Sequence, residues 1–319
     1  MTAPRPTPSD PAAQRADWAQ ARERSSLPAL RLMAWIAITV GRRVARAVLV
    51  PITIYFLLFA PGPRRQSKRY LARVLGRRVR WSDLYRHFHA FASTVLDRVY
   101  FARGELGAFD IRHQGTDELE AAVSDGRGAV LVGAHIGSFE ALHAVGASRP
   151  GLRVAMVMYP DNARMIHSVL ATIAPQTHLD VIPIGRHGST LAIRDWLAGG
   201  GIAGMLGDRY LAAEPGRAGL VDLPFLGQDA PFSEGPLRLA LLLRQRVYFM
   251  AALYRGGAQY ELRFEPLVDF RPGAPSAAGG AEQVHGALRA YVARLEAVCR
   301  EAPYNWFNFH DFWNPDGKH

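Results

Sequence analysis

The chain has 319 residues, 49% of them hydrophobic, which is enough for one large α/β core with an N-terminal extension. Its single cysteine, Cys299, excludes an internal disulfide, and no Cys/His cluster has the spacing of a zinc site, so we expect neither a metal nor a cofactor. The net charge of +10 is concentrated in residues 1–80, which hold 16 Lys or Arg against 3 Asp or Glu, whereas the remaining residues hold 22 against 25.

Residues 1–16 are rich in proline and small polar residues, and we expect a disordered tail without a signal peptide. Residues 17–103 follow as a basic, apolar and helical region. Two apolar runs lie within it, at 27–41 and at 47–62. The second run is shorter than the roughly 20 apolar residues of a membrane-spanning helix, and arginines flank it on both sides. The pattern therefore favours a hairpin or a helix that lies in the membrane interface.

The cations beside these apolar runs indicate an anionic membrane surface as a partner. Nucleic acid is a weaker alternative, because the sequence contains no recognisable nucleic-acid-binding module, and we expect no specific binding to it. A pair of buried core helices in a soluble, merely basic region is the remaining alternative.

From residue 104 to residue 319, short apolar strands alternate with amphipathic helices, which predicts a mostly parallel central sheet flanked by helices. The expected strands are 128–135, 152–159, 179–185, 201–207, 246–255 and 260–267. The expected helices are 161–174, 189–200, 233–245 and 281–301. Functional sites in such sheets lie beyond the carboxyl ends of the strands.

His135 stands at such an end, in GAHIGSFEAL, five positions before Glu140. On one continuous helix the two side chains would point about 140° apart, so they can meet only if His135 lies in the turn before the helix. Gly137 permits that turn and Ser138 is a good N-cap. We therefore predict that Glu140 orients one imidazole nitrogen and leaves the other as a general base. A buried structural histidine is the alternative.

No protein nucleophile accompanies this pair. The stretch PFSEGP has Pro231 where a nucleophile elbow requires glycine, and nothing marks Cys299 as catalytic. The nucleophile expected from the sequence is a substrate hydroxyl, deprotonated by His135 as it attacks an activated acyl group.

Four stretches, taken in order and at their separations, carry a family resemblance. They are GAHIGSFEAL, GMLGDRY (204–210), PFLGQDAPFSEGPLRLA (224–240) and YNWFNFHDFW (304–313). Together they resemble the bacterial lipid A late acyltransferase family, within the glycerolipid acyltransferase superfamily that shares the H-x4-D/E motif. The resemblance covers residues 20–313, and the aromatic ending is similar to a branch of predicted acyltransferases.

The resemblance implies transfer of a fatty acyl chain from acyl carrier protein or coenzyme A to a hydroxyl of a membrane glycolipid such as a lipid A precursor. His135 and Glu140 are then catalytic. Arg209 suits a donor or acceptor phosphate or the developing oxyanion, with Asp208 as its positioning partner. A structural ion pair is the alternative for these two residues. Ser138, between His135 and Glu140, and Gly207, directly before Asp208, are further candidates for substrate contact.

Other candidates are less specific. Phe232 and Ser233 precede a helix whose N-terminus suits a phosphate or the thioester, although ordinary capping by Ser233 explains the same residues. Arg186 with His187, and Tyr159 with Asp161, end other strands and are candidates for the rim of the same cleft. The aromatic ending predicts core packing, with the lining of an acyl tunnel or contact with lipid as alternatives, for Trp306, Phe307, Phe309, Phe312 and Trp313. His310 and Asp311 are not expected to form a pair, since adjacent strand residues face opposite sides.

These inferences place an acyltransferase on the cytoplasmic face of a bacterial inner membrane. A non-catalytic lipid-binding protein of the same fold and an acyl-thioester hydrolase remain as alternatives.

Overall fold

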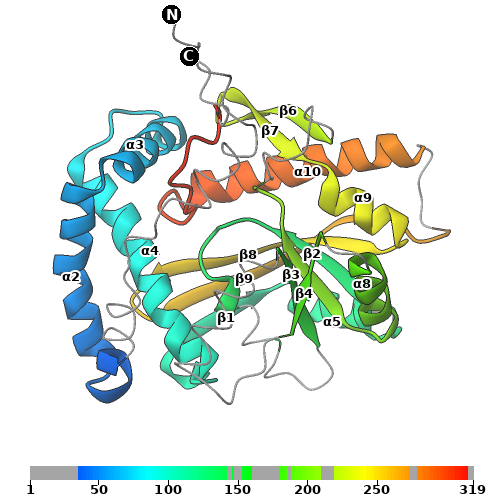
Figure 1. Cartoon of the computed structure of the whole chain (residues 1–319), viewed down its shortest axis with the longest axis horizontal. Coiled ribbons are helices and arrows are strands. Elements are labelled where there is room, and N and C mark those ends of the chain that lie inside the picture. The colour runs from blue at the N-terminus through cyan, green and yellow to red at the C-terminus, as the bar shows by residue number, and fades with distance from the viewer. Residues whose placement is uncertain are drawn as a thin grey trace, which may run out of the picture.

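The computed structural model describes residues 35–141, 146, 153–159, 180–185, 188–209, 219–273 and 279–314. Within these residues, seven strands form one sheet in the order β1-β9-β8-β2-β5-β3-β4 (Figure 1). All its pairs are parallel except β8 with β9. The predicted α/β class with a mostly parallel sheet is confirmed.

The strands are β1 (Asp110–Gln114), β2 (Ala129–Gly133), β3 (Val154–Met158), β4 (Val181–Pro183), β5 (Ile202–Leu206), β8 (Arg246–Gly256) and β9 (Gln259–Asp269). Six of them fall where the apolar runs predict strands. The short strand β1 was not predicted, because its sequence DIRHQ is polar and four of its five residues are exposed.

Helices cover both faces of the sheet because the central strands are apolar on both sides. Along β2, Val130 and Val132 pack in the cluster that includes α8 (Ser189–Ala198), α9 (Gly235–Leu242) and α10 (Gly280–Glu301). Ala129 and Leu131 pack on the other face with residues of α5 (Thr116–Val123). The expected helices at 189–200, 233–245 and 281–301 are confirmed, and the one at 161–174 lies outside the described residues.

The N-terminal region is helical, as predicted, over its described residues 35–103, whereas the expected tail 1–16 and residues 17–34 lie outside the described residues. It contains α2 (Arg42–Phe59), α3 (Pro61–Leu75) and α4 (Trp81–Ala102), and α4 leads through the short helix η1 (Leu106–Ala108) to β1. Figure 1 shows α2 along one side of the molecule with α4 between it and the sheet. Among the described residues, no single helix has the length and hydropathy of a membrane span, whereas α2 and α3 taken together pass that test and are bent by 93° at their junction.

Two segments outside the seven-stranded sheet pack against each other, since Phe225 of the first contacts Trp306 of the second. A hairpin of β6 (Leu220–Phe225) and β7 (Gln228–Ser233) precedes α9 and was not predicted from the sequence. After α10, the segment 302–314 runs beside α3 and α10 (red in Figure 1). It is fixed by the ion pair of Arg69 with Asp311 and by a hydrogen bond from the Tyr304 hydroxyl to Asp83.

Candidate active site

Two neighbouring parallel strands deliver a histidine and an aspartate to the same edge of the sheet. In the register of β2 and β5, Gly133 lies opposite Leu206. His135 follows Gly133 by two residues, and Asp208 follows Leu206 by two residues. A hydrogen bond from the Gly207 amide to the Gly133 carbonyl, 2.8 Å long, continues the pairing past the strand ends. The sheet register itself therefore brings the two side chains together.

His135 and Asp208 form a doubly hydrogen-bonded pair. The imidazole Nδ1 lies 2.8 Å from Asp208 Oδ1, and the backbone amide of His135 donates to Asp208 Oδ2 at 3.0 Å. The Asp208 side chain is 2% exposed, whereas that of His135 is 30% exposed. The acid is thus buried behind a histidine that reaches solvent. His135 is not the sealed structural histidine that the sequence left as an alternative.

This geometry fixes the chemistry of the imidazole. An ionised carboxylate can only accept hydrogen bonds, so the proton of a neutral His135 ring sits on Nδ1. Nε2 then carries a lone pair and is available to take a proton, as in the histidine of a catalytic triad. Burial alone would raise the pKa of Asp208, but the charge and hydrogen bonds of His135, with the charge of Arg209, hold that pKa well below its usual range. The acid is therefore ionised at neutral pH.

The predicted partner of His135 was wrong. Glu140 forms an ion pair with Arg98, with 3.0 Å between Arg98 Nε and Glu140 Oε1, and accepts the Ser138 hydroxyl at 3.3 Å. No hydrogen bond joins Glu140 to the imidazole within the described part of the chain. The position that Glu140 was expected to fill is occupied by Asp208. The prediction that Asp208 positions Arg209 stays a prediction: the hydrogen bonds of Asp208 go to His135 and Trp306, while its charge acts on Arg209.

The turn that follows His135 forms as the sequence predicts. Gly137 has a φ of +61°, and a Cβ added there would lie 1.7 Å from the Ala252 carbonyl oxygen, so only glycine fits. Ser138 is fully buried, and its hydroxyl accepts the Ala141 amide at 3.2 Å. This is the geometry of an N-cap. The Ser138 side chain is thus used to cap the helix.

A third hydrogen-bond donor to Asp208 comes from the far end of the chain. The indole Nε1–H of Trp306 donates to Asp208 Oδ2 at 2.9 Å, and the Trp306 side chain is fully buried. The backbone of the same segment pairs with the His135 turn, since the Phe307 amide donates to the His135 carbonyl and the Gly137 amide to the Asn305 carbonyl. The sequence predicted core packing for this aromatic segment, which is confirmed, but it carried no signal for the hydrogen bond to Asp208.

Arg209 and His310 lie in the electrostatic neighbourhood of the pair. Loss of solvent around the His310 ring, followed by the positive charge of Arg209, lowers the pKa of His310 to about 4, and the charges of Asp208 and His135 also act on it. Asp311 instead pairs with Arg69 on α3. His310 therefore lies within reach of the charges of this pair, and it does not pair with Asp311, as the sequence predicted.

Some of the remaining candidates from the sequence serve packing or capping in the fold, and others fall outside the described residues. Phe232 is buried in the core, and the Ser233 hydroxyl accepts the Gly235 amide at 3.1 Å, next to the N-cap residue Glu234 of α9. Gly207 contributes its backbone amide, which donates to the Gly133 carbonyl. Tyr159 is 39% exposed at the end of β3. Arg186, His187 and Asp161 lie outside the described residues. Cys299 is buried, and burial raises its pKa well above the usual range, which agrees with its non-catalytic assignment.

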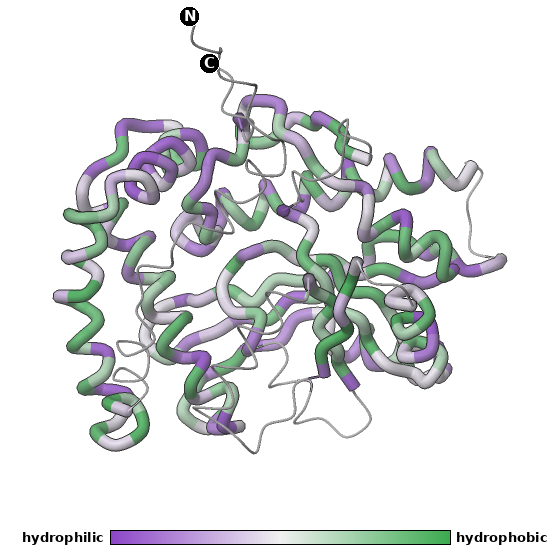
Figure 2. Tube along the Cα trace, viewed as in Figure 1, coloured by the Kyte–Doolittle hydropathy of each residue, from purple (hydrophilic) through white to green (hydrophobic). Residues whose placement is uncertain are grey.

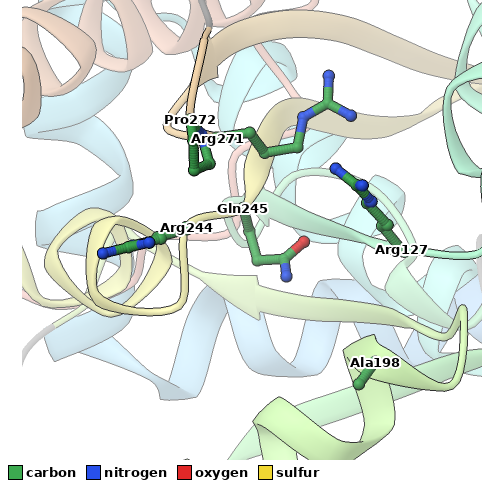
Figure 3. Close-up of a pocket in the computed structure, with 6 residues that line it drawn as sticks. All are labelled: Arg127, Ala198, Arg244, Gln245, Arg271 and Pro272. Carbon is green, nitrogen blue, oxygen red and sulfur yellow. The ribbon is translucent and has the colours of Figure 1, made fainter.

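A pocket of about 310 Å³ lies at the opposite edge of the sheet and contains none of these residues. Its lining, shown in Figure 3, is Arg127, Ala198, Arg244, Gln245, Arg271 and Pro272. Arg127 precedes β2 and Gln245 precedes β8, so the pocket sits at the amino ends of these strands. In α/β sheets of this kind the reaction centre lies at the other edge.

Comparison with known proteins gives one positive finding. The family described as bacterial lipid A biosynthesis acyltransferase matches residues 27–314. The match spans the N-terminal helices, the sheet and the C-terminal aromatic segment, and it includes His135, Asp208 and Trp306. No match was found among curated proteins.

Proposed function

The chain belongs to the bacterial lipid A biosynthesis acyltransferase family, and we propose that it moves a fatty acyl chain from an acyl-carrier-protein or coenzyme A thioester to a hydroxyl of a membrane glycolipid, with His135 as general base. Acyl transfer in lipid A biosynthesis is the activity of the family; the donor, the acceptor and the role of each residue are our proposal. The observation that carries it is the partly exposed imidazole held by buried Asp208 at the carboxyl edge of the sheet.

In this mechanism the lipid hydroxyl is the nucleophile. Nε2 of His135 takes its proton as the oxygen attacks the thioester carbonyl carbon, and the C=O electron pair moves onto oxygen to give a tetrahedral oxyanion. The oxyanion collapses, the C–S bond breaks, and the imidazolium returns the proton to the departing sulfur. Asp208 stays ionised and stabilises the imidazolium throughout. No acyl-enzyme forms on this route.

Arg209 follows Asp208 directly and supplies a cation beside the pair. A guanidinium at this place suits the developing oxyanion or a phosphate of donor or acceptor. Glu140 lies in the first helical turn after His135, where it forms an ion pair with Arg98 of α4. It is a second acid at the same edge of the sheet. We assign it a supporting role in this site, with Asp208 as the residue that orients the base.

The membrane association that we propose rests on α2. Its buried residues form a narrow stripe of Ala45, Leu49, Thr53 and Leu57. The other side is also apolar, with Val44, Val50, Ile54, Tyr55, Leu58 and Phe59 exposed, and α2 is mostly green in Figure 2. An exposed apolar surface of this kind beside cations is typical of a helix that lies in an anionic membrane interface. We propose that this surface docks to the cytoplasmic face of the inner membrane.

The flanking cations divide into two groups. Arg42 and Arg46 turn inward, where Arg42 pairs with buried Asp97 at 2.8 Å and Arg46 donates to the Tyr254 hydroxyl at 2.8 Å. Arg43, Arg65, Lys68 and Arg69 are exposed. The exposed group on α3 is therefore the part of the basic excess that we expect to meet anionic lipid headgroups.

The test is a product assay with purified protein. An acyl donor labelled in its acyl chain, as acyl carrier protein thioester in one arm and coenzyme A thioester in the other, is mixed with vesicles that contain a lipid A precursor. We expect label in the lipid, an amount that falls by orders of magnitude in His135→Ala, and no labelled protein in the mass spectrum. Release of free fatty acid without labelled lipid identifies a hydrolase. Turnover by neither donor identifies a non-catalytic lipid-binding protein, and either result overturns the proposal.

A further inference from the structure

The carboxylate of Asp208 has a third donor that the proposed chemistry does not account for. Oδ2 accepts both the His135 backbone amide, at 3.0 Å, and the Trp306 indole N–H, at 2.9 Å, while Oδ1 faces the imidazole. Asp208 is almost completely buried, so these three N–H groups replace water around its charge. Two of the donors belong to His135 itself. Trp306 is the donor that comes from elsewhere in the chain.

Trp306 is itself held by a buried histidine. His87, on α4, lies with Nε2 2.9 Å from the Trp306 carbonyl oxygen and Nδ1 2.7 Å from the Ser67 hydroxyl on α3. A carbonyl only accepts, so Nε2 carries the proton and Nδ1 accepts the hydroxyl proton of Ser67. Burial lowers the pKa of His87 to about 4, which keeps this arrangement neutral. A chain of hydrogen bonds thus runs from two N-terminal helices through Trp306 to Asp208.

Ring contacts fix the indole plane as well. Tyr70, Phe225 and Phe312 each meet the Trp306 ring edge-on, with centroids 5.0 to 5.3 Å apart. Such contacts would hold any aromatic ring of similar size at this place. They do not explain why the residue at this place carries an N–H group aimed at a carboxylate. That group compensates the buried charge of Asp208, and it also fixes the direction of the carboxylate.

We propose that Trp306 is a positioning residue of the active site, which holds the Asp208 carboxylate in the plane that orients His135, and that Ser67 and His87 fix Trp306 from behind. The inference rests on the proposed role of His135. Without the indole donor, Oδ2 keeps one donor and the carboxylate can rotate away from Nδ1. The imidazole then loses its fixed tautomer and direction, which lowers the rate of the chemical step and leaves substrate binding unaffected.

Trp313 provides a matched control within the same segment. Its indole also donates a hydrogen bond, to the Phe225 carbonyl at 3.3 Å, and its ring also packs on Phe225 and Phe312. It makes no hydrogen bond to Asp208 or His135 in the described structure. Trp306→Phe and Trp313→Phe therefore each remove an indole and its donor from the same aromatic cluster, but only the first removes a donor from the acid.

The experiment measures acyl transfer to lipid with the labelled donor. For Trp306→Phe we expect kcat to fall on the order of 10–100-fold, as for other residues that orient a reacting group, with KM within about twofold. Trp313→Phe should keep kcat within about threefold of wild type, since the donor that it removes serves the Phe225 carbonyl and not the acid. Equal losses of kcat in the two variants would overturn the proposal. If Trp306→Phe does not fold, Trp306→3-benzothienylalanine keeps the ring volume and exchanges only the N–H for sulfur.

A double-mutant cycle separates positioning from general structural damage. In an Asp208→Asn background the ionised acid is already absent, so adding Trp306→Phe should lower kcat by far less than it does in the wild-type background. A full second loss in that background means that Trp306 acts on something other than Asp208 and contradicts the proposal. The failure of the proposed function is distinguishable, because His135→Ala would then retain turnover whatever the Trp306 variants do.

Discussion

At the scale of single residues, the buried histidine His87 makes stability depend on pH. Burial lowers its pKa to about 4 in the folded protein, against 6.5 in an unfolded chain. The unfolded state therefore binds the proton more readily, and stability that is present above pH 6.5 is lost as the pH falls toward 4. The driving force is the cost of placing an imidazolium between Ser67 and the Trp306 carbonyl without water.

We predict that the free energy of unfolding drops by about 2 kcal/mol between pH 7 and pH 5 through His87 alone, from a shift of this size. In His87→Gln this part of the pH dependence should vanish, although the variant is less stable at pH 7. Urea unfolding at the two pH values measures both quantities. His113→Gln, at an exposed position on β1, is the control. An unchanged pH dependence in His87→Gln would show that His87 is protonated in the folded protein at pH 5.

The sequence singled out both members of the His135–Asp208 pair as site candidates, but it assigned His135 to Glu140 and Asp208 to Arg209. His135 and Asp208 both stand after apolar strands, and the rule that sites lie at carboxyl edges selected both. Their separation of 73 positions hides the contact, because only the register of β2 against β5 brings them together. Glu140 was preferred as the partner because it is close in sequence. The hydrogen bond from Trp306 to Asp208 could not be predicted, because nothing in an aromatic run distinguishes an indole that only packs from one that also donates to an acid.

At the scale of elements, the turn between β2 and the following helix determines where His135 points. Gly137 has a positive φ and lies against the backbone of β8. The backbone amide of the next residue, Ser138, donates to the Ala252 carbonyl of β8 at 2.9 Å. Any side chain at residue 137 forces β8 and the turn apart. His135, the proposed general base, is two residues away and shares this backbone.

Gly137→Ala should therefore lower the melting temperature and abolish most acyl transfer. Gly126→Ala is the matched control, because Gly126 also has a positive φ, +76°, but has open space where a Cβ would lie. Strain alone costs the control about 1 kcal/mol, whereas Gly137→Ala adds a clash with backbone and should cost several times that amount. Thermal unfolding and the transfer assay measure the two effects. Equal destabilisation of both variants would show that the turn moves aside freely.

Elements with a clear apolar period were predictable, and those without one were not. The central strands and α10 lie within a few residues of their expected bounds, since their burial follows directly from their apolar residues. The strand β1 is polar and depends on pairing with β9. The β6–β7 hairpin contains Pro224 and Pro231, which favour a loop reading, yet the two residues fall in a two-stranded ladder. The secondary structure of such segments depends on pairing with a distant strand, which the local sequence does not indicate.

At the scale of the whole molecule, α2 carries two apolar sides with different uses. The narrow stripe packs against α4, and the opposite side is exposed, with Phe59 61% and Tyr55 57% exposed. The buried ion pair of Arg42 with Asp97, joined by the Tyr260 hydroxyl at 2.9 Å, anchors this helix to the sheet. The proposed membrane surface is thereby fixed relative to the active site.

Phe59→Asp should weaken binding to vesicles of phosphatidylglycerol at least about tenfold, because one buried aromatic side chain contributes about 1.5–3 kcal/mol and the new charge is repelled by anionic lipid. Leu242→Asp, at a residue 69% exposed on α9, controls for the loss of any surface hydrophobe. Sedimentation with vesicles measures both affinities. Equal behaviour of the two variants would place the membrane contact away from α2.

Which acid serves His135 is decided most directly by the kcat values of Asp208→Asn and Glu140→Gln in the lipid transfer assay. Asp208→Asn keeps the shape of the site but removes the charge that holds the imidazole tautomer, so we predict a loss of about 10³-fold or more, as for the equivalent change in a catalytic triad. Glu140→Gln should lose no more than about tenfold, since its carboxylate meets Arg98 rather than the imidazole. A near-normal kcat for Asp208→Asn together with an inactive Glu140→Gln would contradict the assignment of Asp208 as the acid that orients the base.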